Sequence, residues 1–174
     1  MSRSAIGRPA PGEHAQYYEK YVSLVPEGDI VSTLSEQAGT TLSLLGGIPE
    51  TKADSRYAPD KWSIKEVVGH LIDCERIFAY RALRFARNDA TPQPGFEQDD
   101  YVRNAEFSQT LLADLVVEFD CLRRANVYMF KGLTADAWLR GGSANDSDVS
   151  VRALAHIIAG HELHHVGILR SRYL

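Results

Sequence analysis

A segment near the C-terminus, Val151 to Leu169, constrains the fold of this chain more than any other feature. It reads VRALAHIIAGHELHHVGIL, has no proline, and places histidines on a face that is otherwise aliphatic. Residues four apart in an α-helix differ in direction by about 40° and lie about 6 Å apart, so His161 and His165 can direct their imidazoles toward one point. Imidazoles buried among aliphatic side chains need polar partners, and a shared cation supplies one. The segment therefore predicts a core helix that carries two metal ligands.

The same residues, HELHH, match the zincin pattern HExxH, in which two histidines bind zinc and the glutamate acts as general base. Zincins take a third ligand from residues downstream of this motif. Only VGILRSRYL follows His165, and it contains no His, Asp or Glu. The protease interpretation therefore loses most of its support. Glu162 is then expected to be a solvated helix residue, or a hydrogen-bond partner that orients a ligand or bound water.

Composition limits the classes of protein to consider. The 174 residues, 44% of them apolar, are enough for one compact domain, and 19 basic against 23 acidic residues leave a net charge of −4. This balance lacks the basic excess of nucleic-acid-binding proteins, so no nucleic-acid partner is expected. No apolar run approaches the roughly 20 residues of a membrane span, and the N-terminus lacks the apolar region of a secretory signal. A cytoplasmic protein without a membrane partner is the simplest interpretation.

Three further long helices are indicated by apolar residues at spacings of three and four. One begins at Ile30 and ends at Gly46-Gly47, a helix-stop signal. The next begins after Ser63, which forms the capping-box pattern SxxE with Glu66, and ends near Asn88 before ATPQPG. A third is expected from Ser108, as N-cap, to Gly132. Between it and the last helix, residues 134–148 are expected to form a short helical turn and a polar loop, with Ser150 or Asp148 as the next cap.

Four helices of about 18 to 27 residues, with no convincing alternating strand pattern, predict an all-α four-helix bundle. We expect a single domain over residues 1–174, in which residues 1–13, rich in Pro, Gly and Ser, form a flexible arm. The two cysteines, Cys74 and Cys121, lie in helical segments and are expected to be packed thiols rather than a disulfide.

A third metal ligand has to come from another helix, because metal sites of this kind need at least three protein ligands. His70 is the outstanding candidate, since it lies on the rim of the apolar stripe of residues 63–88. Alone it would more often be a hydrogen-bonded histidine at the edge of the core, and the C-terminal pair makes ligation the favoured role. Cys74, one turn further on, is expected to pack, and Asp73 could support a ligand.

Three stretches carry a resemblance to a known family: KWSIKEVVGHLID, with His70 and Asp73, then PQPGF, then GHELHH. From Trp62 to the C-terminus the chain resembles the DinB/YfiT-like superfamily. This resemblance implies a four-helix bundle that holds a divalent metal on His70, His161 and His165. Zn is the first choice, with Ni or Fe as alternatives, because neutral imidazoles suit all of them.

The resemblance also implies a function, because the superfamily includes S-transferases and isomerases that use low-molecular-weight thiols. Other members are described as metal-dependent hydrolases. An open metal site permits either chemistry, since it can activate water or lower the pKa of a thiol. We therefore expect a metal-dependent enzyme with a small-molecule substrate, such as a low-molecular-weight-thiol S-transferase. The alternatives are a metal-dependent hydrolase and a non-enzymatic, metal-stabilised, stress-associated bundle.

The remaining candidates concern substrate and partner contacts. Arg81 and Arg84, with Tyr80, could reach an anionic substrate, although arginines also solvate bundle surfaces. His164 points about 100° away from His165, so it is expected to make hydrogen bonds or to face solvent or a partner chain. A homodimer is plausible, because three tyrosines gather near the N-terminus. They are Tyr17, Tyr18 and Tyr21.

Overall fold

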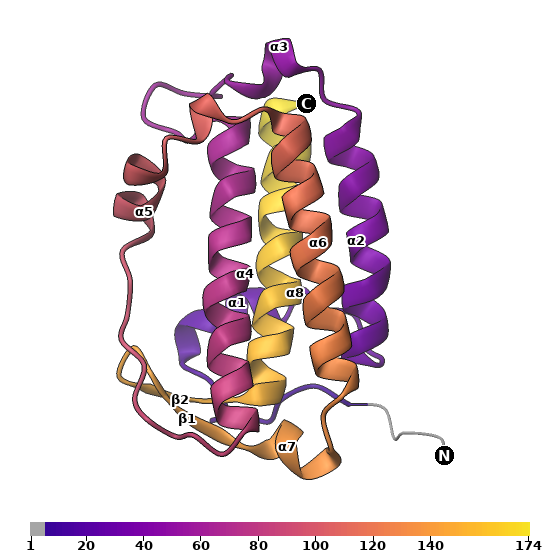
Figure 1. Cartoon of the computed structure of the whole chain (residues 1–174), viewed down its shortest axis with the longest axis vertical. Helices are drawn as coiled ribbons and strands as arrows, with labels where there is room; N and C mark the ends of the chain where they lie inside the picture. The colour runs from indigo at the N-terminus through magenta and orange to yellow at the C-terminus, as the bar shows by residue number, and fades with distance from the viewer. Residues whose placement is uncertain (1–5) are drawn as a thin grey trace.

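Four long helices form a bundle in the computed structural model, which describes residues 6–174 (Figure 1). They are α2 (Ile30–Gly46), α4 (Ile64–Ala86), α6 (Leu112–Lys131) and α8 (Val151–Ile168). Helix α4 packs most extensively on α8 and also on α6, while α2 packs on α6 and α8. The pairs α2/α4 and α6/α8 therefore lie diagonally across the bundle. The predicted all-α four-helix bundle is confirmed.

Shorter elements connect the four helices (Figure 1). Helix α5 lies in the long crossover between α4 and α6, outside the bundle, and a hairpin and α7 precede α8. A π-helical turn, Leu169–Tyr173, continues α8. The remaining bounds are 3₁₀ turns Gln16–Tyr18 and Phe107–Gln109, α1 (Glu19–Val22), α3 (Glu50–Ala53), α5 (Gln98–Ala105), α7 (Ala135–Leu139), β1 (Gly141–Ala144) and β2 (Ser147–Ser150).

Side-chain caps set the starts of three of the long helices. The Asp29 carboxylate accepts a hydrogen bond from the backbone N–H of Ser32 at the start of α2. At α4 both bonds of the predicted capping box are present: Glu66 N–H donates to Ser63 Oγ, and Ser63 N–H donates to Glu66 Oε2. Of the two predicted caps of α8, Ser150 and Asp148, the structure has Ser150. These local signals explain why the expected and observed starts agree.

The predicted start of α6 after Ser108 is wrong. Ser108 lies in a 3₁₀ turn, and α6 begins at Leu112. The backbone N–H of Leu112 is capped from a distance, because it donates to Glu50 Oε2 at 2.9 Å. The turn also brings the Phe107 ring onto Gly69 of α4, where an added Cβ would lie 2.3 Å from ring atoms. Tertiary contacts, rather than a local cap, place the start of this helix.

The polar loop expected before α8 is instead a β-hairpin. Strands β1 and β2 pair antiparallel, with Gly141 opposite Ser150 and Ala144 opposite Ser147. The two turn residues, Asn145 and Asp146, have φ values of 51° and 58°. Both being in the left-handed region is typical of a type I′ turn, which Asn and Asp tolerate. The hairpin is a small addition to an otherwise helical fold.

The flexible arm expected over residues 1–13 is corrected for the part that the structure describes. Arg8 donates to the backbone carbonyls of Val22 and Val25, both at 2.6 Å. Glu13 accepts hydrogen bonds from Ser150 and Arg152. Residues 6–13 are therefore held against α8 and the segment after α1, while residues 1–5 lie outside the described residues.

Two other expectations can be compared with the structure. Cys74 is buried, as expected, but Cys121 is exposed on α6, so it is not a packed thiol. None of the helices in the described part of the chain is long and apolar enough to cross a lipid bilayer.

Candidate metal centre

A layer of polar side chains crosses the middle of the bundle and separates two apolar clusters. Along α8 and the π-helical turn that continues it, the buried residues of one cluster end at Ala159 and those of the other begin at Leu169. On α6, Phe119 belongs to one cluster and Val127 to the other. The side chains between them include three histidines and a buried ionic network. Such a layer costs free energy of desolvation unless its members bind one another or a ligand.

The structure brings His70 of α4 together with His161 and His165 of α8. One ring nitrogen of each histidine lies within 4.8 Å of a ring nitrogen of the other two, and all three side chains are buried. His70 Nε2 and His161 Nε2 lie 3.0 Å apart. The one-turn spacing of His161 and His165 directs both rings to the same side of α8, with ring centroids 4.6 Å apart. The convergence of these three predicted residues therefore follows from the packing of α4 on α8.

Aromatic rings surround the three imidazoles. Trp62 lies 4.6 Å from the His70 ring, centroid to centroid, and Tyr21 lies 5.3 Å from the His161 ring. The Tyr21 contact depends on Gly160, because a Cβ there would lie 2.0 Å from the Tyr21 carbonyl oxygen. A side chain at residue 160 would hold α1 away from α8. The rings exclude water from most of the cluster.

Burial lowers the pKa of every histidine in the cluster. It brings the pKa of His70 to about 4 and that of His165 to about 3, and that of His161 also falls well below its usual range. Desolvation is the main cause, since it disfavours the charged imidazolium. The neighbouring histidines lower the pKa of His161 and His165 further by charge repulsion. At neutral pH the three rings are therefore neutral, which is the form that binds metals.

The three residues fit a divalent metal. Nitrogens that bind one Zn²⁺ in tetrahedral geometry, at about 2.0–2.1 Å each, lie roughly 3.3 Å from one another. The observed 3.0 Å between His70 Nε2 and His161 Nε2 is close to that value. Three protein ligands are also the number found in catalytic zinc sites, which keep a further position open.

An ionic network, which the sequence did not reveal, lies beside the histidines. Arg123 of α6 donates to both carboxylate oxygens of Glu75 at 2.8 Å and to Glu162 at 2.6 Å. Thr41 donates to the second oxygen of Glu162 at 2.5 Å, and Asn126 donates to Glu75. The expectation that Glu162 is a solvated helix residue is therefore wrong, because it is only 1% exposed. A buried Glu needs a partner, and here the partner is Arg123 of α6.

The other candidates lie near the cluster without joining it. Cys74 Sγ is 3.6 Å from both ring nitrogens of His70, and burial raises the pKa of its thiol to about 12. It is therefore a neutral packed thiol. His164 packs edge-on against the Tyr21 ring, and Asp73 is half-buried with Arg76 3.8 Å away. Arg84 pairs with Asp89.

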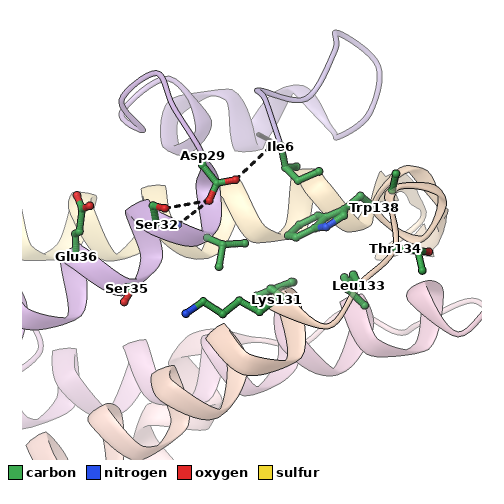
Figure 2. Close-up of a pocket in the computed structure, with 12 residues that line it drawn as sticks. Ile6, Asp29, Ser32, Ser35, Glu36, Lys131, Leu133, Thr134 and Trp138 are labelled. Atoms are coloured by element: carbon green, nitrogen blue, oxygen red, sulfur yellow. Dashed lines mark hydrogen bonds between the residues drawn. The ribbon is translucent and has the colours of Figure 1, made fainter. Parts of the chain in front are cut away.

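Two cavities reach the histidines, each lined by a different member of the cluster. One, of about 390 Å³, is lined by His161, Cys74 and Arg81 among others. The second, of about 240 Å³, is lined by His165 and Trp62. A larger cavity, of about 570 Å³, lies between α2, α6 and α7, with Trp138 and Lys131 on its walls (Figure 2). None of the three histidines lines that larger cavity.

The fold and the cluster define a four-helix bundle with three histidines shared between two helices. The family model of the DinB superfamily matches residues 33–169, and the chain belongs to that superfamily. Among solved structures it is similar to YfiT from Bacillus subtilis, described as "a probable metal-dependent hydrolase with an unusual four-helix bundle topology". The two share 15% identity over 93% of this chain and 91% of that chain, with a TM-score of 0.66. At this identity the likeness shows a common fold. No curated protein matches the chain significantly.

Proposed function

We propose that His70, His161 and His165 bind a divalent metal ion, with Zn²⁺ first and Ni or Fe as alternatives, and that the protein is a metal-dependent enzyme. The observation that carries this proposal is the convergence of three buried, neutral imidazoles within 4.8 Å. Without a cation, three desolvated rings would share few polar partners in the described part of the core. The description of YfiT as metal-dependent supports the same conclusion.

The chain's own residues prepare the site for chemistry on a small molecule. Three protein ligands would leave a coordination position open on a bound ion, and the cavity lined by His161 lies beside the cluster. When bound, the ion would lower the pKa of a thiol or of water held beside it. The surrounding rings of Tyr21, Trp62 and Phe78 keep the imidazoles oriented and limit the entry of water.

Within this class we propose transfer of a low-molecular-weight thiol to an organic electrophile. The sulfur forms a bond to the electrophilic carbon, the leaving group departs with its electron pair, and the thiol proton passes to solvent. The aromatic walls of the 390 Å³ cavity suit an organic electrophile. Hydrolysis is the second candidate, because the similar protein YfiT is described as a probable hydrolase.

Parallel assays separate these reactions. Zinc-loaded protein is incubated with 1-chloro-2,4-dinitrobenzene and bacillithiol, mycothiol or glutathione, and the thioether is measured by mass spectrometry. Hydrolysis is followed with 4-nitrophenyl acetate. We expect thioether formation that falls to the uncatalysed rate in His161→Ala and persists in His164→Ala, the matched neighbour outside the cluster. Unchanged turnover in His161→Ala would contradict the mechanism, and ester cleavage alone would favour the hydrolase.

A non-enzymatic role makes a different prediction for metal removal. An ion that only joins α4 to α8 should lower the free energy of unfolding greatly when a chelator removes it, with no turnover to lose. A catalytic ion in this prepacked site should be removed with loss of turnover while the helical structure remains. Circular dichroism and turnover measured on the same stripped sample distinguish the two.

A further inference from the structure

The cavity of about 390 Å³ beside the histidines has a cationic end. It lies between α1, α4, the segment after α4 and the β-hairpin turn, with His161 and Cys74 at one end and Arg81 at the other. Arg81 follows Cys74 by seven residues on α4, which corresponds to a helix rise of about 10 Å. The cavity can therefore hold a molecule that extends from Arg81 to the histidine cluster.

Arg81 is a buried cation without a carboxylate partner in the described part of the chain. Arg81 is 3% exposed, and one of its guanidinium nitrogens donates a hydrogen bond to the Pro94 carbonyl at 2.5 Å. No ion pair within 4.0 Å includes it, whereas the buried Arg123 has two carboxylates and Arg152 has Glu13. The Tyr18 hydroxyl is a second, uncharged hydrogen-bond partner, and since a guanidinium carries five N–H donors, these two partners leave donors for a ligand.

The nearest titratable neighbours of Arg81 do not compensate its charge. Burial raises the pKa of the Tyr18 hydroxyl, so it is neutral at physiological pH. The one acidic side chain among the described residues that line the cavity is Glu97, which is exposed. Burying an uncompensated guanidinium is costly, and a bound anion would remove that cost.

Aromatic side chains form the walls between the two ends. Tyr18 and Phe78 pack edge-to-face, with ring centroids 6.2 Å apart, and the Arg81 guanidinium lies 5.9 Å from the Phe96 ring centroid. These walls suit an apolar or planar body rather than a sugar or a polar peptide. A single guanidinium pairs well with a monoanionic carboxylate in a two-bond arrangement, while the acidic Glu97 at the cavity disfavours a dianion.

We propose that this cavity binds an organic carboxylate, with its carboxylate on Arg81, its apolar body between Tyr18, Phe78 and Phe96, and its far end toward His161. The anion site stands on the residues of the cavity alone. The statement that the far end is the reacting end rests on the proposed function. Arg81 is thereby the residue that selects acidic substrates.

Binding of a defined probe tests this proposal. Isothermal titration calorimetry of metal-free protein compares 4-phenylbutyrate with 4-phenylbutanol, which lacks the charge, and with 4-phenylbutylphosphonate, which carries a second one. Wild type should bind the carboxylate roughly 10- to 100-fold more tightly than the alcohol, as expected for hydrogen bonds to a charged group. Arg81→Met should abolish that preference and Arg81→Lys should keep part of it. Arg84→Met, one turn away and paired with Asp89, should leave it unchanged.

Several results would overturn the anion site. They are equal binding of carboxylate and alcohol, no binding of the carboxylate at millimolar concentration, tighter binding of the phosphonate, or a preference that survives Arg81→Met. If Arg81→Met does not fold, ¹⁵N-arginine NMR of wild type decides: the Arg81 Nε–H resonance, assigned with Arg81→Lys, should shift with phenylbutyrate and not with phenylbutanol. Failure of the proposed function can be distinguished from failure of the anion site. If the protein binds no zinc but still prefers the carboxylate, the metal-dependent function is refuted and the anion site stands.

Discussion

Replacement of Arg123 by Leu should strongly destabilise the protein, because Arg123 is the cation of a buried ionic network. Arg123 makes a two-bond ion pair with Glu75 and a third bond to Glu162, and the three residues are 1–3% exposed. Removal of the guanidinium leaves two carboxylates buried without a cation. Breaking a buried pair from one side costs about 3–5 kcal/mol, a large share of the roughly 5–15 kcal/mol that stabilises a typical domain.

This cost can be measured by urea unfolding at neutral pH, followed by circular dichroism. For a chain of this size it corresponds to a fall in Tm of roughly 6–20 °C. The matched control is Arg124→Leu. Arg124 is the next residue on α6, but its side chain is 70% exposed and its ion pair with Asp120 is loose, with 3.7 Å between Nε and Oδ2. The control should change the free energy of unfolding by less than about 0.5 kcal/mol. A loss of less than about 1 kcal/mol for Arg123→Leu would refute the reasoning from burial.

Two further predictions concern the packing of the N-terminal segment. Gly160→Ala should cost about 1–3 kcal/mol by urea unfolding, because its Cβ would lie 2.0 Å from the Tyr21 carbonyl and must displace α1; a neutral effect would show that the close approach is not required. Glu13→Gln should lower the free energy of unfolding near neutral pH but not at strongly acidic pH. The Arg152 hydrogen bond lowers the pKa of Glu13 to about 2 from 4.5, so its stabilisation, on the order of 1–2 kcal/mol after screening, is full above pH 4.5 and lost as pH falls toward 2. If the free energies of unfolding of wild type and Glu13→Gln differ by the same amount from pH 6 to pH 2, this prediction is contradicted.

Features with a local cause were predictable from sequence. The Ser63 and Glu66 capping box, the Ser150 cap and the glycine stop after α2 involve residues close together in the chain, and the structure has all of them. The one-turn spacing of His161 and His165 likewise determines their common direction once a helix is assumed. The third ligand had to come from another helix. The position of His70 on the apolar stripe of its helix, together with the family resemblance, identified it.

Features with a tertiary cause were not predictable. The N–H of Leu112 is capped by Glu50, a residue 62 positions away, so no local pattern marks the start of α6. Arg123 looks like a solvated arginine until α2, α4 and α8 surround it. The hairpin had one local signal, the pair Asn145-Asp146, but its four-residue strands, GGSA and SDVS, are too short and too polar to show apolar alternation.

Metal content and affinity test the central claim most directly. Protein purified without a nickel column is analysed by inductively coupled plasma mass spectrometry, and Zn²⁺ affinity is measured by competition with a chelator. We predict one ion per chain in wild type and in His164→Ala. His70→Ala, His161→Ala and His165→Ala should each weaken binding by more than the about 10- to 100-fold typical of losing an outer-shell partner. A wild type that binds no divalent ion, or alanine variants that bind it as tightly as wild type, would contradict the three-histidine metal centre.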